Sequence, residues 1–191
     1  MSKQLILASS SPRRQELLTQ VNIPYTVRKA DTDESQITTN DPVEKVTQLA
    51  ALKGNETPIL HEDDVILSAD TVVSYQHDIF GKPENKQDAM RMLSTLSGST
   101  HTVYTGVMIR SMNRSVNFVE KADVEFWPLT DSEINWYAST EEPSDKAGAY
   151  GIQAMGAMFV KKITGDYFTI MGLPISRVYQ ELKQFSIHPA L

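Results

Sequence analysis

The chain has 191 residues, no cysteine and a formal net charge of −6, with 40% hydrophobic and 22% charged residues. This length suits one large domain or two small lobes around a cleft, and the lack of cysteine excludes disulfides and thiolate metal sites. A duplex nucleic-acid binder would carry a basic excess. No run approaches the ~20 apolar residues of a membrane span, and no apolar secretion signal opens the chain. We therefore expect a cytoplasmic protein whose partner is neither a membrane nor a nucleic acid.

The first predicted unit is a strand near 4–8 that leads into a helix near 13–21. Ser11 suits the N-cap of this helix, and the proline that follows suits its first position, where a missing N–H costs nothing. A serine loop between strand and helix leaves backbone N–H groups pointing outward, which is a natural anion site. Arg13 and Arg14 oppose the helix dipole in the first turn. Two interpretations stay open: a phosphate site, or a capped surface helix with solvated arginines.

Helices and strands are mixed along the rest of the chain. Further helices are predicted near 42–53, 85–96 and 131–139 and from after Pro174 to about 185, and further strands near 24–29, 64–75, 101–110 and 116–127. A capping box is expected at the start of the 131–139 helix, with Thr130 as N-cap and Glu133 three residues on. The strict alternation of strand and helix ends after residue 98, and the class is α/β or α+β. We expect a single domain over 1–191, built as two lobes of mixed sheet and helices with a central groove.

Asp70 lies inside the apolar strand segment 65–73. Desolvation disfavours a carboxylate there unless it is paired, bound to a metal or catalytic. The alternative is an aspartate that caps a turn at a strand end. Apolar residues continue on both sides, which favours a functional Asp70. A regular strand would turn Thr71 to the other face, so a bend is expected if both side chains contact a ligand.

Three lysines stand at positions suited to a phosphate site. Lys53 ends a predicted helix, Lys82 lies in a Gly-Lys-Pro loop, and Lys146 opens a glycine-rich segment. Each alone is typical of a solvated surface lysine. Together with Arg13 and Arg14 they could neutralise a polyphosphate.

The glycine-rich segment 145–153 reads D-K-A-G-A-Y-G-I-Q. Small residues let the backbone approach a ligand, and Gln153 offers a donor and an acceptor to a base edge. The alternative is a close-packed turn between lobes. No P-loop or dinucleotide-binding glycine motif is present. Phe126, Trp127 and Trp136 are interpreted as core rather than as a base-stacking platform.

Six motifs follow one another along the chain, and the resemblance that they carry extends from Leu5 to about Phe185. They are S-x-S-P-R-R at 9–14, S-A-D-T-V-V at 68–73, G-K-P at 81–83, L-S-G-x-x-H at 96–101, D-K-A-G-A-Y-G-I-Q at 145–153 and G-L-P at 172–174. In this order they resemble the Maf family of nucleoside triphosphate pyrophosphatases. The resemblance implies a two-lobed fold related to that of inosine triphosphate pyrophosphatases, with a nucleotide in the groove. It also implies metal-dependent cleavage of a nucleoside triphosphate to the monophosphate and pyrophosphate. Such proteins are often homodimers, act in house-cleaning and have been linked to septum formation.

The resemblance also implies roles for individual residues. Asp70 is the proton acceptor that activates water. Arg13, Thr71 and Gln153 match the specificity positions of the branch that prefers dTTP and UTP. The positions implied around the phosphates are Ser9, Arg13, Arg14, Lys53 and Lys82.

The cofactor implied by the resemblance is a divalent metal, Mg²⁺ or Mn²⁺, held by Asp33 and Asp70. Many relatives have two glutamates where this chain has Asp33-Glu34. Asp33 is shorter and reaches less far, so Glu34 stays open as the alternative ligand.

Three hypotheses follow. The leading one is hydrolysis of dTTP and UTP, extended to modified pyrimidine nucleotides. The second is a broader pyrophosphatase of modified nucleotides. The third is a non-catalytic regulator of cell division or a nucleic-acid binder. The acidic net charge and the lone Asp70 favour an enzyme.

Overall fold

The computed structural model describes residues 3–29 and 31–190, and within them seven strands form one mixed sheet. The strand order is β2-β1-β3-β5-β6-β7, and β4 pairs with β3. β1 runs parallel to β2 and β3, and the other pairs are antiparallel. The strands are β1 (Gln4–Leu7), β2 (Thr26–Val27), β3 (Asp64–Tyr75), β4 (Asp78–Phe80), β5 (Thr100–Arg110), β6 (Ser115–Phe126) and β7 (Val160–Gly165). The predicted mixed α/β class is confirmed.

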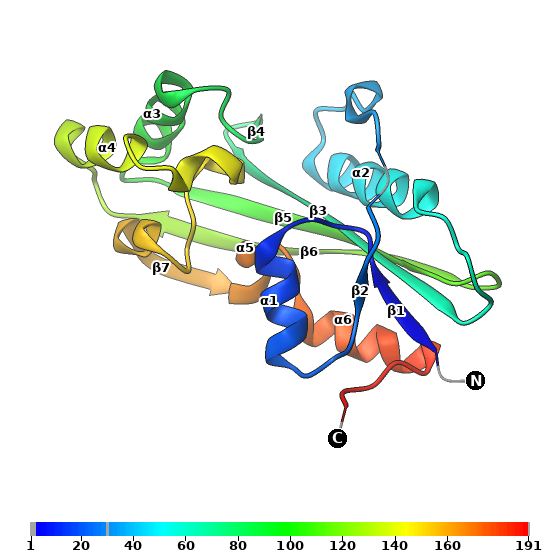
Figure 1. Ribbon diagram of the computed structural model, residues 1–191. Coiled ribbons are helices and arrows are strands. Elements are labelled where there is room, and N and C mark those ends of the chain that lie inside the picture. The colour runs from blue at the N-terminus through cyan, green and yellow to red at the C-terminus, as the bar shows by residue number, and fades with distance from the viewer. Residues whose placement is uncertain (1–2, 30, 191) are drawn as a thin grey trace.

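Helices lie on both sides of this sheet (Figure 1). The α-helices are α1 (Pro12–Gln20), α2 (Pro42–Glu56), α3 (Lys86–Leu96), α4 (Asp131–Ala138), α5 (Tyr167–Met171) and α6 (Ile175–Leu182). Short 3-10 helices are η1 (Glu34–Gln36), η2 (Glu142–Asp145), η3 (Ala147–Ala149), η4 (Met155–Phe159) and η5 (Lys183–Phe185). In Figure 1, α3 and α4 lie together at one end of the sheet, and α1, α2 and α6 gather toward the other. Among the described helices, none combines the length and the apolar character needed to span a membrane.

The first strand–helix unit forms as predicted, with one difference at its cap. Ser11 occupies the N-cap and Pro12 the first helical position, but the Ser11 side chain makes no capping hydrogen bond. The Ser11 backbone N–H instead donates to Ser9 Oγ at 3.2 Å. Leu17 and Leu18 of α1 are fully buried in the main hydrophobic core. Burial of this apolar face therefore stabilises α1 in place of a side-chain cap.

β3 has the predicted bounds and one partly free edge. On that edge, β1 pairs with residues 64–67 and β4 pairs with residues 73–75. Between them, residues 68–72 have no strand partner among the described residues. On the opposite edge, β5 pairs with β3 without interruption over 66–74. Because β1 ends here and leads toward α1, the middle of β3 is left open on one edge.

Gly106 of β5 lies directly opposite Asp70 in the β3–β5 register. A Cβ atom at position 106 would lie 2.4 Å from the carbonyl oxygen of Val46 in α2. Only glycine permits so close a contact between helix and sheet. The contact matters for the site because α2 carries Lys53 over the middle of β3.

Four of the strands and α-helices differ from the sequence prediction. β4 was not predicted, because three residues are too few to show an alternation. β2 covers only Thr26–Val27 of the predicted 24–29, and it stands at the edge of the sheet after a proline that has no N–H to pair. β7 was not predicted, because its residues are mostly exposed and show no apolar alternation. α5 was not predicted either, because five residues are too few to show a helical period.

Phe126, Trp127 and Trp136 do not form one core cluster. Phe126 is buried, but Trp127 and Trp136 are 51% and 48% exposed. The core interpretation is therefore wrong for the two tryptophans. Trp127 lies just beyond the end of β6, and Trp136 occupies an exposed position of α4.

Candidate active site

A cavity of about 1110 Å³ lies beside the free edge of β3. Its walls come from the serine loop before α1, from α2, from β4 and the loop that follows it, and from the glycine-rich segment. The fold brings all the predicted site residues but one to this cavity. Those that line it are Ser9, Arg13, Arg14, Lys53, Asp70, Thr71, Lys82 and Gln153. The exception is Asp33.

Asp70 lies in the middle of β3, so the alternative of a turn cap at a strand end is excluded. Its Oδ1 is hydrogen-bonded and ion-paired to Lys53 Nζ. Both side chains are mostly buried, at 13% exposed for Asp70 and 19% for Lys53. Lys53 Nζ also lies 3.0 Å from Glu34 Oε1. Within the described ranges, Asp70 Oδ2 accepts no hydrogen bond, so this oxygen is available to accept a proton.

Arg14 connects three segments around the cavity. Its Nε donates to Gly172 O at 2.7 Å, its Nη1 to Ser9 Oγ at 3.2 Å and its Nη2 to Thr71 Oγ1 at 3.3 Å. Burial lowers the pKa of Arg14 from its usual value, and the charge of Asp70 opposes this shift. Arg14 therefore fixes the serine loop against β3 and places a positive charge near Asp70.

Asp70 and Thr71 face opposite sides of the sheet, yet both line the cavity. The Thr71 hydroxyl lies 2.8 Å from the Thr105 hydroxyl, which donates to the carbonyl oxygen of Thr169 in α5. Asp70 instead meets Lys53 of α2. The expected bend is absent, because β3 pairs with β5 without a bulge through both positions. We conclude that the cavity reaches both side chains by wrapping around the free edge of β3.

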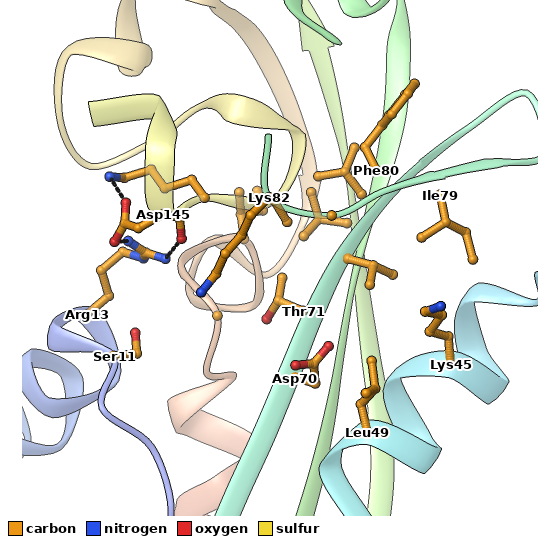
Figure 2. Close-up of a pocket in the computed structure, with 18 of the residues that line it drawn as sticks. Ser11, Arg13, Lys45, Leu49, Asp70, Thr71, Ile79, Phe80, Lys82 and Asp145 are labelled. Atoms are coloured by element: carbon orange, nitrogen blue, oxygen red, sulfur yellow. Dashed lines mark hydrogen bonds and ion pairs between the residues drawn. The ribbon is translucent and has the colours of Figure 1, made fainter. Parts of the chain in front are cut away.

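Arg13 forms an ion pair with Asp145, a residue that was not predicted for the site. Arg13 Nη1 donates to Asp145 Oδ2 at 3.1 Å, and Lys146 Nζ donates to Oδ1 at 2.7 Å (Figure 2). Partial burial alone would raise the pKa of Asp145. The hydrogen bond from Lys146 and the charge of Arg13 outweigh burial and lower it. Asp145 is thus an anion held between two cations at the site, and no local sequence signal pairs it with Arg13.

Lys82 reaches into the space between the Arg13–Asp145 pair and Asp70 (Figure 2). It stands in the exposed loop after β4. Within residues 3–29 and 31–190, no carboxylate lies at ion-pair distance from the Lys82 ammonium group. Its charge is therefore available to an anionic ligand.

Asp33 and Glu34 are adjacent in the sequence, but their side chains contact different parts of the structure. Asp33 caps η1, where its Oδ1 accepts from the Ser35 hydroxyl at 2.6 Å and from the Ser35 N–H at 3.1 Å. These hydrogen bonds lower the pKa of the exposed Asp33. Glu34 lines the cavity and pairs with Lys53. The structure thus brings Glu34, and not Asp33, to the same lysine as Asp70. The described residues contain no group of three histidine or acidic side chains that would by itself hold a metal.

An apolar wall was not predicted. Leu49 of α2 and Ile79 and Phe80 of β4 line the cavity on one side (Figure 2). Ile79 and Phe80 reach the wall because β4 pairs with β3 in a short hairpin, and this pairing was not predicted from the sequence. Apolar walls with a few convergent polar groups are typical of small-molecule sites.

Comparison with known proteins gives close relatives over nearly the full length. The family model described as "Maf-like protein" matches residues 4–185, a range that includes every residue predicted for the site. A protein of Bacillus cytotoxicus named dTTP/UTP pyrophosphatase is 48% identical over 183 residues, which cover 96% of each chain. A protein of the same name from Halalkalibacterium halodurans is 51% identical over 181 residues, which cover 95% of each chain.

Among solved structures, a HAM1 protein from Coxiella burnetii gives a TM-score of 0.46 at 12% identity. The match covers 95% of this chain and 99% of that one. A likeness of this size carries no argument about activity.

Proposed function

This chain belongs to the Maf family, and from that premise we propose that it hydrolyses dTTP and UTP to the nucleoside monophosphate and pyrophosphate. Relatives at 48% and 51% identity are named for this activity. The single observation that carries the proposal is Asp70 in the cavity wall, with Lys53 on one oxygen and the other free. A carboxylate so placed, among cations, suits the attack of water on a polyphosphate.

In the proposed reaction, Asp70 Oδ2 accepts a proton from a water molecule as the water oxygen attacks the α-phosphorus. The bond between the α-phosphorus and the bridging oxygen breaks, and pyrophosphate leaves with the electron pair. Lys53 orients Asp70 through Oδ1. The residues proposed to surround the phosphates are Ser9, Arg13, Arg14, Lys53 and Lys82. The positive charges of the two arginines and two lysines offset the negative charge of the phosphates, which would otherwise repel the attacking nucleophile, and Ser9 adds a neutral hydroxyl.

We propose that turnover requires a divalent metal, Mg²⁺ or Mn²⁺. Asp70 and Glu34 both contact Lys53 Nζ, so carboxylate oxygens from two segments converge beside the cavity. Mg²⁺ commonly binds one or two carboxylates together with substrate phosphate oxygens, and this donor pair fits that mode. The ion would supply Lewis-acid polarisation of the phosphates. The proposed ligands are therefore Asp70 and Glu34, in place of Asp33.

We propose that Gln153, Thr71 and Arg13 select the base. A glutamine amide can pair with the O4/N3 edge of uracil or thymine, because it offers one donor and one acceptor. A site built on such hydrogen bonds rejects bases that leave its polar groups unpaired. Modified pyrimidines that keep this edge belong to the same proposed substrate class.

Pyrophosphate release measured across canonical and modified nucleotides tests the proposal. Preference for dTTP and UTP is the expected result. No release from any nucleotide would favour the alternative, a non-catalytic regulator of cell division or a nucleic-acid binder. In cells, a septum phenotype that survives Asp70→Asn would also favour the regulator. The proposed cytoplasmic homodimer is tested by light scattering on the purified protein and by cell fractionation.

A further inference from the structure

The end of the glycine-rich segment and the three residues that follow it close into a small loop, residues 151–156, which carries Gln153 to the cavity. Within it, the Ala154 N–H donates to Gly151 O at 3.4 Å, so Gln153 lies inside a tight turn. The two ends of the loop touch, because a Cβ atom at Gly156 would lie only 2.7 Å from Gly151 O. The 151–156 loop is therefore a closed unit, and its position sets that of Gln153.

Two side chains from outside the loop hold its ends. Tyr137 Oη accepts from the Gly151 N–H at 3.1 Å and donates to Glu142 Oε1 at 2.8 Å. Glu142 Oε1 also accepts from the Gly156 N–H at 3.0 Å, and Oε2 accepts from the Met155 N–H at 3.0 Å. One tyrosine and one glutamate thus bind three backbone N–H groups at both ends of the loop.

The burial of Tyr137 and the charge of Glu142 favour the hydrogen bonds that hold the ends of the loop. Tyr137 of α4 is fully buried and packs edge-on against Phe159, with ring centroids 4.9 Å apart. Burial and the neighbouring Glu142 raise the pKa of the Tyr137 hydroxyl, which keeps it protonated as a donor. A carboxylate accepts hydrogen bonds only, and it accepts several at once. Neither Tyr137 nor Glu142 lines the cavity, so neither is in position to contact the substrate.

We propose that Tyr137 and Glu142 are positioning residues that set base selectivity by holding the 151–156 loop, and with it Gln153, against the pyrimidine edge. This inference rests on the proposed role of Gln153 in base selection. A hydrogen-bonding site discriminates only if its donors and acceptors are placed in advance. With its ends released, the loop would let the Gln153 amide move, and wrong bases would be rejected less. The proposed phosphate end of the site, built from the serine loop, α1, α2 and the loop after β4, would keep its geometry.

The test compares Tyr137→Phe and Glu142→Gln with Glu141→Gln in the full chain. Glu141 is a matched control, because it is adjacent and exposed and its carboxylate makes no hydrogen bond with the described residues. Hydrogen exchange of the 151–156 amides reports on the loop, and the melting temperature reports on folding. Calorimetric binding of dTMP and dGMP measures base preference without turnover. Values of kcat and KM for dTTP and dGTP report on the reaction.

In both variants we expect amide exchange in the loop to accelerate about tenfold or more, the size expected for a lost hydrogen bond to a charged group. The preference for dTMP over dGMP should fall by a similar factor. KM for dTTP should rise, while kcat and inhibition by pyrophosphate stay nearly unchanged. The control should match the wild type in every measurement.

Two results would overturn the inference. One is a faster-exchanging loop with an unchanged base preference. The other is an equal loss of binding for dTMP and dGMP, which would indicate a purely structural role. If Glu142→Gln does not fold, Glu142→Asp keeps the charge and displaces the acceptor, and it is judged by the same measurements.

This design separates failure of the inference from failure of the proposed function. A wild type that prefers dTMP but releases no pyrophosphate from dTTP would contradict the hydrolysis, while the variants would still be judged by binding. A wild type that binds dTMP and dGMP equally would overturn the inference even if it released pyrophosphate.

Discussion

Arg13 of α1 is tied to Asp145 of η2, with 3.1 Å between Arg13 Nη1 and Asp145 Oδ2 (Figure 2). Arg13 Nη2 also donates to the Asp145 carbonyl oxygen at 3.5 Å. A phosphate that approached Arg13 would meet a cation already paired with a carboxylate. We therefore expect Asp145 to weaken the binding of anions at this site.

Asp145→Asn should strengthen inhibition by pyrophosphate, because the amide keeps the shape of Asp145 without its charge. Half-exposed ion pairs are weak, so the gain should stay within about fivefold and shrink at higher salt. Inhibition constants at two ionic strengths measure it, with Glu62→Gln in the exposed turn before β3 as the control. Weaker inhibition in Asp145→Asn would instead mean that Asp145 orients Arg13 for the ligand.

Asp70→Asn should lower turnover by about 10²–10⁴-fold, because the amide cannot accept the proton from water. Pyrophosphate release at saturating substrate measures this, and circular dichroism with thermal melting checks the fold. Asp78→Asn is the matched control, since Asp78 lines the same cavity from β4 but is exposed. Near-normal turnover in a folded Asp70→Asn protein would remove Asp70 from the mechanism.

Pyrophosphate release should stop in excess chelator and return with Mg²⁺ or Mn²⁺. Glu34→Gln should raise the metal concentration needed for half-maximal activity, because Glu34 shares Lys53 with Asp70. Asp33→Asn should change this concentration little, since Asp33 is engaged as the cap of η1. A larger effect of Asp33→Asn than of Glu34→Gln would indicate that Asp33 is the metal ligand. Full activity in chelator would contradict a metal requirement altogether.

Gln153→Glu should reduce kcat/KM for dTTP and UTP more than it reduces the rate of the chemical step. The change replaces an amide donor with a negative charge, which cannot donate to the pyrimidine edge. The measurement is kcat/KM for dTTP, UTP, CTP and GTP in the wild type and the variant. An equal loss for all four nucleotides would mean that Gln153 supports the fold or the phosphates and does not read the base.

His101 should make the fold sensitive to acid. Burial lowers the pKa of His101 from 6.5 to about 4, and its Nε2 lies 2.8 Å from the Tyr150 hydroxyl beside the cavity. Because the pKa is lower in the folded protein, protons bind preferentially to the unfolded chain. The contribution of the neutral His101 to folding stability is therefore complete above about pH 6.5, and it is lost as the pH falls toward about 4.

The loss in the free energy of unfolding should be on the order of 2 kcal/mol between about pH 7 and about pH 5. Urea unfolding at the two pH values measures it. His101→Phe should remove most of this dependence, since it has no group to protonate. If the wild type and His101→Phe lost stability equally at acid pH, other titratable groups would be responsible for the loss.

Local patterns predicted the elements whose stabilising interactions lie within a few residues. The capping box of Thr130 and Glu133 forms at the start of α4. Asp41 caps α2 through the Glu44 N–H, and the two strands predicted near 101–110 and 116–127 form as β5 and β6 and pair with each other. By contrast, β7 depends on the neighbouring β6 for its hydrogen bonds, so its own sequence predicts little.

The amino-acid sequence by itself determined the family, the mixed α/β class and eight of the polar residues that line the cavity, because most of them stand in short motifs that keep their order. The tertiary structure alone decided which side chains meet. It pairs Arg13 with Asp145, 132 residues away, and brings Glu34 rather than Asp33 to Lys53. It also leaves the middle of β3 without a strand partner on one edge, since β1 and β4 pair only with its two ends. Such contacts depend on packing between distant segments, which no local pattern encodes.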